Sequence, residues 1–225
     1  MTATTSAASR ALPHPATTVA GLAPDLVPYA RGLDLQAAAV ARIERGADRG
    51  TVIMLEHESV YTAGRRADPE EYPADGSPVV PVDRGGRVTW HGPGQLVCYP
   101  VIRLRGGAGV VDLVRALETA IIAAMSDLGL AGARIEGRSG VWVQHHDVPA
   151  KVAQIGLHAR AGIITHGIAV NCCNDPAPFA AIVPCGIRDA GVTTLSAMAG
   201  RRIAPAELAP FLDGRLAAAI AELVA

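Results

Sequence analysis

The feature that most constrains the fold is a change of hydrophobic period near residue 130. From 110 to 128 the apolar residues lie on one helical stripe, with Asp112 in the first turn and Gly129 just after the end. Beyond it, residues 140–143, 151–158 and 162–171 show the alternation or short apolar runs that are typical of strands. A short link at 160–162 would make the last two strands a hairpin. A helix followed by consecutive strands predicts an α+β fold.

The remaining segments complete this prediction of a mixed β-sheet flanked by helices. We expect helices over 33–48, 193–198 and 205–224, strands over 51–55, 79–82 and 96–102, and loops over 63–78 and 172–188. Pro100 indicates that its strand lies at an edge or contains a bulge. Residues 1–20 are small and polar, so we expect a mobile N-terminal tail, with 21–225 forming a single domain.

Charge and composition narrow the classes of partner. The 225 residues carry 20 Lys and Arg against 21 Asp and Glu, a net charge of -1, and only 4% are aromatic. Neither a broadly basic surface nor a base-stacking surface is expected, which disfavours a nucleic-acid partner. The chain also lacks an uncharged apolar stretch long enough to span a membrane, and its first twenty residues do not resemble a secretory signal. We therefore expect a cytoplasmic protein.

Several common site motifs are missing from the sequence. There is no P-loop and no G-x-S-x-G nucleophile motif, and Gly92-Pro93-Gly94 does not fit a dinucleotide-binding fingerprint. Cys172 and Cys173 are adjacent, as are His145 and His146, whereas zinc ligands stand two to four residues apart. We expect no metal site.

The run from 84 to 95 is the strongest local signal for a binding site. Its glycines let the backbone approach a ligand closely and expose amide N–H groups. Arg84, Arg87 and His91 could bind an anion, and Trp90 could supply an apolar wall. The alternative is an Ω-loop that only packs on itself. The interleaving of Gly with Arg, Thr, Trp and His favours the binding interpretation.

Two reactive side chains stand further along the chain. Lys151 begins an apolar strand, and taken alone it is better explained as a lysine whose amine reaches water. Cys185 lies between Pro184 and Gly186, a setting that presents its thiol in a turn. A nearby cation would help this thiol to ionise, because a free thiol has a pKa of about 8.5. Cys98, Cys172 and Cys173 are better explained as residues in or near the core.

Four segments together resemble the signature series of lipoyl(octanoyl) transferases, the octanoyl-[acyl-carrier-protein]:protein N-octanoyltransferases. They occur in the family's order over about residues 50–200, and they are 84–95, 151–156, 166–171 and 184–186. The resemblance implies a fold similar to the catalytic domain of biotin and lipoate protein ligases. It also implies a catalytic Cys185/Lys151 dyad, against the water-exposed interpretation of Lys151. The substrate-binding residues that it implies are Arg84, Gly85, Gly86, Arg87, Val88, Thr89, Trp90, His91, Gln154, Ile155, Gly156, Gly167, Ile168 and Ala169.

The same resemblance implies the reaction and its partners. Octanoyl would pass from the phosphopantetheine thioester of octanoyl-acyl carrier protein to Cys185, and then to a lysine of an apo lipoyl domain. The acceptors would be 2-oxoacid dehydrogenase E2 subunits and the glycine cleavage H protein, in the first step of endogenous protein lipoylation. No ATP and no metal would be needed. We expect Trp90, Val152, Ile155 and Ile168 to line an apolar slot for the eight-carbon chain.

Two other functions stay open on the sequence alone. An ATP-dependent lipoate or biotin ligase on the same fold would activate its acid as an acyl-adenylate and would need no cysteine. A non-catalytic module that binds lipoyl domains would need neither Cys185 nor Lys151. The segment Pro184-Cys185-Gly186 favours the transferase over both.

Overall fold

The fold is a mixed β-sheet with helices on both faces, as the sequence predicts. The structure is a computed structural model that describes residues 15–145, 148–182 and 190–225. In these residues an eight-stranded sheet has the order β1-β2-β6-β10-β9-β8-β7, with β11 paired to β9. The strands are β1 Ala16–Gly21, β2 Gly50–Leu55, β6 Gln95–Arg103, β7 Ala133–Ile135, β8 Arg138–His145, β9 Val148–Arg160, β10 Ile163–Asn171 and β11 Gly191–Val192.

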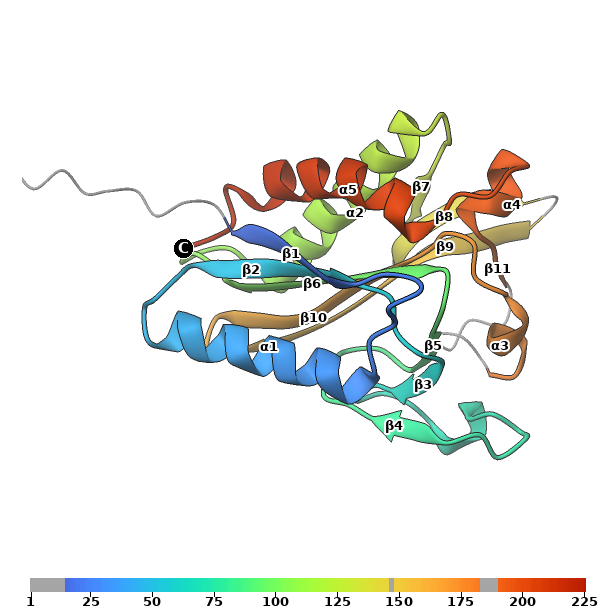
Figure 1. The fold of residues 1–225 in the computed structure, drawn as a ribbon, viewed down its shortest axis with the longest axis horizontal. Helices are drawn as coiled ribbons and strands as arrows, with labels where there is room; N and C mark the ends of the chain where they lie inside the picture. The colour runs from blue at the N-terminus through green and yellow to red at the C-terminus, as the bar shows by residue number, and fades with distance from the viewer. Residues whose placement is uncertain (1–14, 146–147, 183–189) are drawn as a thin grey trace, which may run out of the picture.

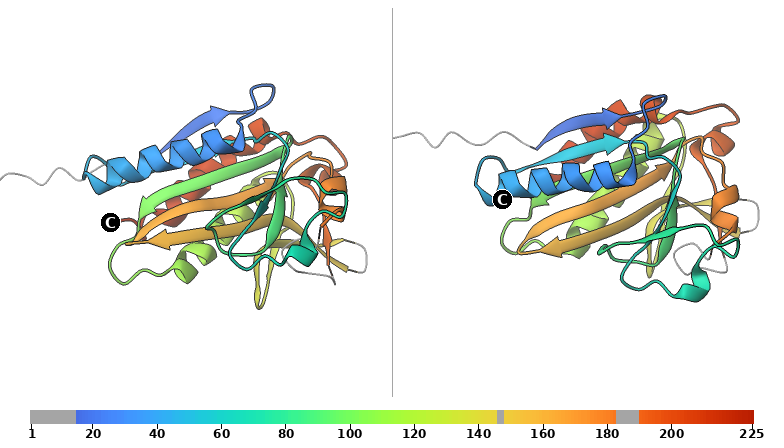
Figure 2. Two further views of the ribbon diagram at one scale, coloured as in Figure 1. Left: turned by 90° about the horizontal axis from the view of Figure 1, so that it is seen from below. Right: turned by 60° about the horizontal axis from the view of Figure 1, so that its bottom comes forward.

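The helices make two outer layers around this sheet. Helix α1 (Tyr29–Glu44) covers one face, and α2 (Val110–Asp127) and α5 (Pro205–Ile220) lie together on the other (Figure 1). Figure 2 shows α1 running alongside β6 and β10, and α1 also contacts β2. The short helices α3 (Ala177–Ala180) and α4 (Leu195–Ala199) lie near the β11 end of the sheet. None of the helices in the described residues is long and apolar enough to cross a membrane.

A small second sheet lies beside one end of the main sheet. Its order is β4-β3-β5, with β3 at Val60–Ala63, β4 at Val79–Pro81 and β5 at Val88–His91. A single 3-10 turn, Pro69–Glu71, precedes β4 and has Asp68 as its N-cap. Strand β5 shows that the run 84–95 is not an Ω-loop throughout: its β-branched and aromatic residues pair with β3, and only its flanks are turns.

The β9–β10 hairpin confirms the predicted turn. Ala161 and Gly162 link the two strands, and both have positive φ angles, 49° and 75°. Two central residues with positive φ give the twist that a two-residue hairpin requires. This hairpin forms the middle of the sheet and carries most of the predicted binding segments.

Two expectations need correction at their ends, and the edge alternative for Pro100 is excluded. Residues 16–20 belong to β1 and pair in parallel with β2, so the predicted tail reaches too far. Helix α1 begins at Tyr29 instead of residue 33, because Gly32 interrupts the apolar stripe where the helix packs against His57. Pro100 lies in the central strand β6, not at an edge. Opposite it, the pairing of β10 with β6 stops at 164 and resumes at 168.

Candidate active site

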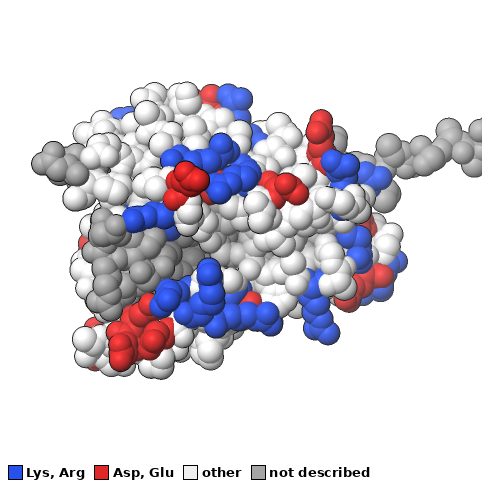
Figure 3. Space-filling model, turned by 180° about the vertical axis from the view of Figure 1, so that it is seen from behind, with Lys and Arg blue, Asp and Glu red and all other residues white. Residues whose placement is uncertain are grey.

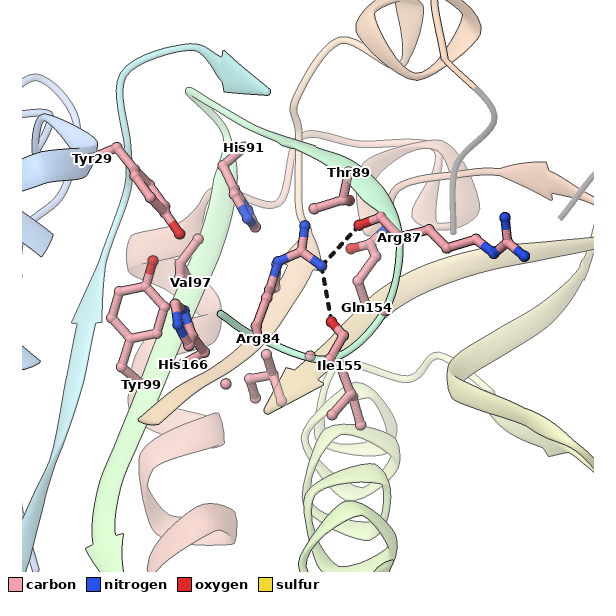
Figure 4. A pocket seen from close by; sticks show the side chains of 16 residues that line it. Tyr29, Arg84, Arg87, Thr89, His91, Val97, Tyr99, Gln154, Ile155 and His166 are labelled. Carbon is pink, nitrogen blue, oxygen red and sulfur yellow. Dashed lines mark hydrogen bonds between the residues drawn. The ribbon is translucent and has the colours of Figure 1, made fainter. Parts of the chain in front are cut away.

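A pocket opens on the α1 face of the sheet, where β9 and β10 approach the small sheet (Figure 4). It brings together twelve of the predicted binding residues, from three separate stretches of the sequence. They are Arg84, Gly85, Gly86, Arg87, Thr89, His91, Gln154, Ile155, Gly156, Gly167, Ile168 and Ala169. Tyr29, Val97, Tyr99 and His166 complete the lining.

Arg84 organises the loop at the mouth of this pocket. Its Nη1 donates to the carbonyl oxygens of Gly85 and Arg87 at 3.0 and 2.9 Å. Its Nη2 donates to the carbonyl and hydroxyl oxygens of Thr62 at 2.9 and 2.8 Å. The Gly85 N–H in turn donates to the carbonyl of Leu157 at 2.8 Å, which ties the loop to β9. The guanidinium therefore fixes the shape of the loop.

These contacts count against the anion-binding interpretation of the loop. The Nη atoms of Arg84 already donate to loop oxygens, and Arg87 forms an ion pair with the buried Glu71. Burial, with a smaller effect from the charges of His57 and Arg84, lowers the pKa of His91 to about 3, so its ring is neutral. Basic and acidic side chains also lie interspersed on the surface shown in Figure 3.

Strand alternation divides β5 between two environments. Thr89 and His91 face the pocket, whereas Val88 and Trp90 face a separate apolar cluster that includes Phe179. The Trp90 indole N–H donates to the Ser59 hydroxyl at 2.9 Å. The structure therefore places Val88 and Trp90 outside the pocket, and the expected Trp90 wall is wrong.

The expected apolar slot needs a second correction. Val152 lies in the core beneath α2 and α5, outside the pocket. Ile155 and Ile168 are among the lining residues, but the Ile155 side chain points away from Arg84 and His91 (Figure 4). The apolar surface near the loop comes instead from Val97 and the rings of Tyr29 and Tyr99.

Aromatic and imidazole rings form the wall under α1. Tyr29 stacks on His91, with ring centroids 6.2 Å apart and planes within 8°. The hydroxyl of Tyr99 lies 2.7 Å from Nε2 of His57, whose Nδ1 lies 2.8 Å from the carbonyl oxygen of Val27. Burial lowers the pKa of His57 to about 4, so this ring is neutral: Nδ1–H donates to the carbonyl and Nε2 accepts from the tyrosine. Hydrogen bonds among its own residues therefore hold this wall in place.

Sequence reasoning missed the four residues that complete the lining. Val97 and Tyr99 alternate along the predicted strand 96–102, so the strand pattern places them on one face together. His166 begins one of the four family-like segments, but it was not singled out. No local pattern marks Tyr29, because the helix that carries it reaches the pocket only through the tertiary fold.

A β-bulge directs Lys151 toward the pocket face. Val141 pairs with Ala153 and Trp142 with Lys151, so β9 has one extra residue between these pairs. Val141 and Ala153 share the core beneath α2 and α5, hence Trp142 and Lys151 point to the opposite face, as does Gln154. The Nζ of the buried Lys151 lies 4.6 Å from the Trp142 ring centroid. Lys151 does not line the pocket itself, but it precedes the lining residue Gln154 by three positions on the same strand.

Gln154 has an unusual environment in this pocket. The residue is 6% exposed, and both its Nε2 and its Oε1 are buried without a hydrogen-bond partner among the described residues. A buried amide left in this state costs about 1–3 kcal/mol. This amide is therefore available to hydrogen-bond a polar ligand group in the pocket.

The predicted nucleophile, Cys185, lies outside the described residues. The residues on either side of its segment are placed: Ile182 belongs to the Trp90 cluster, and Val192 packs against the same cluster. Val192 is paired with Lys151, and the Thr193 N–H donates to the Lys151 carbonyl at 3.1 Å. Residues 191–193 therefore lie directly beside the lysine.

The other three cysteines are poor nucleophiles in this fold. Burial raises the pKa of Cys98 and of Cys172, which lie in the core under the sheet, so both remain thiols. Burial also raises the pKa of the partly exposed Cys173. In the described part of the chain no cluster of three or more His, Cys, Asp or Glu side chains could hold a metal ion.

Comparison with known proteins adds independent findings. Residues 28–215 match the family model described as the lipoyl protein ligase A/B catalytic domain. The octanoyltransferase of Clavibacter sepedonicus is 50% identical over 207 residues, which cover 90% of this chain and 89% of that protein. The octanoyltransferase of Paenarthrobacter aurescens is 49% identical over 190 residues, covering 84% and 86%.

Solved structures share the fold at much lower identity. A bipartite lipoate protein ligase from Thermoplasma acidophilum has a TM-score of 0.69 at 14% identity, covering 93% of this chain and 84% of that one. A lipoate-protein ligase A bound with ATP has a TM-score of 0.64 at 14% identity, covering 92% and 86%. These likenesses confirm the predicted ligase-type architecture.

Proposed function

The chain belongs to the lipoyl protein ligase A/B catalytic-domain family, and from this membership we propose that it is an octanoyltransferase of protein lipoylation. The support is the identity of about half of all residues with relatives named octanoyltransferase, over most of both chains. The ATP-bound ligase is only 14% identical, so its likeness concerns the fold alone. A transferase is therefore favoured over an ATP-dependent ligase.

The proposed reaction has two acyl transfers. The thiolate of Cys185 attacks the thioester carbonyl of octanoyl-acyl carrier protein and displaces the phosphopantetheine thiolate, which takes up the proton that the Cys185 thiol lost on ionisation. The amine of a lipoyl-domain lysine then attacks the enzyme thioester, forming an amide and releasing the Cys185 thiol. Because the donor is already a thioester, the first step replaces one thioester by another at nearly equal free energy. The second step replaces a thioester by a more stable amide, so it is favourable. The reaction needs neither ATP nor a metal.

Lys151 is the proposed partner of the nucleophile in both steps. As an ammonium it stabilises the Cys185 thiolate, and as a neutral amine it accepts a proton from the attacking lysine. Three features support this role: the bulge that turns Lys151, the burial of its side chain, and the pairing with Val192 just beyond the cysteine segment.

Within the structure, the observation that best supports an acyl group in this pocket is the unsatisfied amide of Gln154. Its Nε2 is positioned to donate to the carbonyl oxygen of an acyl group bound in the pocket. Gln154 follows Lys151 by three residues and points to the same face, so a carbonyl held there lies on the lysine side of the pocket. The acyl chain then extends along Gly156 and Gly167, which line the pocket on the two hairpin strands.

The partners follow from this chemistry. The donor is octanoyl-acyl carrier protein, and the acceptors are apo lipoyl domains of 2-oxoacid dehydrogenase E2 subunits and of the glycine cleavage H protein. Such a protein acts in the cytoplasm, without a nucleic-acid or membrane partner.

Intact-mass analysis tests the covalent step directly. Mixed with octanoyl-acyl carrier protein, the enzyme should gain one octanoyl group, and peptide mapping should place it on Cys185. Cys185→Ser should remain folded and lose at least about a thousandfold of the transfer rate. Octanoyl on Cys98, Cys172 or Cys173 would contradict the assignment, as would no label. Exchange of pyrophosphate into ATP in the presence of octanoate would identify a ligase instead.

Substitution of Lys151 separates its two roles. Lys151→Arg keeps a positive charge but does not deprotonate in proteins. This variant should retain part of the self-acylation of Cys185 and lose most of the transfer to the lipoyl domain. Lys151→Ala should slow alkylation of Cys185 near neutral pH as well. If Lys151→Ala leaves both the alkylation profile and turnover unchanged, the lysine has neither role.

A further inference from the structure

A second groove lies beyond the far end of the pocket, between α1 and the turn end of the β9–β10 hairpin. Its apolar surface comes from Leu33, Ala37 and Val40 of α1 and from Ile163 of β10. His166 is the one described residue that lines both the pocket and this groove. The imidazole of His166 therefore stands between two cavities.

The backbone of His166 has an unusual conformation that other residues hold in place. Its φ angle is +58°, in the left-handed region that few non-glycine residues adopt. The pairing of β10 with β6 is interrupted here, and the His166 N–H donates instead to Oε1 of Gln36 on α1, at 2.6 Å. A strained residue that its surroundings fix this firmly is a candidate for a functional role.

The side chain of His166 is fixed as well. Its Nε2 lies 2.7 Å from Oδ1 of Asp83, whose other carboxylate oxygen lies 3.0 Å from Nδ1 of His158. The ring meets the Tyr99 ring edge-on, with centroids 6.5 Å apart. Only about a twentieth of the side chain is exposed. The imidazole is thus a rigid wall, not a freely rotating side chain.

The distance from Gln154 to this wall matches an eight-carbon chain. His166 pairs with Leu157, three residues beyond Gln154 on β9. Three residues of strand span about 10 Å. An octanoyl group has seven carbon–carbon bonds that each advance an extended chain by about 1.25 Å, so it reaches about 9 Å, close to that span. An acyl group with its carbonyl at Gln154 therefore ends near His166.

We propose that His166 sets the length of the acyl group by closing the pocket at its far end. The inference rests on the proposed function, because it assumes that the acyl carbonyl lies at Gln154. Longer chains meet the imidazole, and the groove beyond it is the space that they would enter if the ring were removed.

His166→Gly tests this proposal, because glycine accepts a positive φ while removing the ring. We would measure kcat/KM for transfer of octanoyl, decanoyl and dodecanoyl groups from acyl carrier protein to an apo lipoyl domain. The dodecanoyl-to-octanoyl ratio should rise at least about tenfold over wild type, since one methylene in an apolar pocket already gives that discrimination. His166→Asn, which tolerates the same backbone conformation, should give a smaller rise.

A matched control and a second measurement make the outcome decisive. His158→Ala removes the other imidazole on Asp83, which lines the groove but not the pocket, and should leave the ratio unchanged. An unchanged ratio in folded His166→Gly and His166→Asn would overturn the proposal. If wild type transfers no acyl group, the proposed function fails by itself. Calorimetric affinities of both proteins for free octanoate and dodecanoate would then still show whether His166 limits chain length.

Discussion

The two faces of the main sheet are built in different ways. Under α2 and α5 the core is apolar, and its buried carboxylate, Glu118, accepts from Arg115, Arg134 and the Gly140 N–H at 2.7–3.0 Å. Under α1 the sheet buries two neutral histidines, and an amide without a partner lies in the pocket. The comparison indicates that one face supplies stability while the other holds polar groups ready for a ligand.

The largest effect on stability should come from the apolar face. Leu117→Ala removes a fully buried side chain from α2 and should lower the free energy of unfolding by about 3 kcal/mol, measured by urea titration. The variant should keep wild-type transfer per folded molecule, because Leu117 itself does not line the pocket. Val111→Ala, on the same helix at 70% exposure, is the control and should change stability by less than about 0.5 kcal/mol. Equal losses in both variants would contradict the assigned packing of α2.

An intermediate effect should come from acid acting on the polar face. His57 has a pKa of about 4 in the folded chain, below its usual value of 6.5, so between these values the unfolded state binds more protons. Stability contributed by the neutral ring is therefore present above pH 6.5 and is lost as pH falls. For His57 alone, the loss between pH 7 and pH 5 should be about 2 kcal/mol. His57→Gln should show a shallower dependence of the unfolding midpoint on pH; an equal slope would remove His57 as the cause.

The smallest effect on stability should have the opposite sign. Gln154→Leu removes an amide that has no partner, so the free energy of unfolding should stay the same or rise by up to about 1 kcal/mol. Octanoyl transfer should fall at least about tenfold, because the acyl carbonyl loses its donor. The matched control is Gln95→Leu, whose amide contacts His91 and Asn171 and whose loss should destabilise the fold. Destabilisation by Gln154→Leu with full activity would show that the amide is only structural.

The sequence predicts the apolar face better than the polar one. Local patterns are sufficient for α2 and for the β9–β10 hairpin, because their periods and turn residues are contiguous. The binding segments were found through the resemblance of short motifs. The orientation of Trp90 and the contribution of Tyr29 could not be found in that way, since they depend on the pairing of β5 with β3 and on where α1 packs. The bulge that turns Lys151 could not be predicted from the sequence either, because a bulge is defined only by how β9 pairs with β8.

The pairing of β11 with β9 also has a consequence for how the protein acquires activity. Gly191 and Val192 align with Ala150 and Lys151 across about forty residues of intervening chain, whereas β8, β9 and β10 follow one another directly. Closing so long a loop slows folding, so local hairpins form before such contacts. In a refolding experiment we therefore expect the circular dichroism signal of the sheet to recover before acyl transfer does. Lys151 acquires its native neighbours on β11 only when that strand has paired with β9.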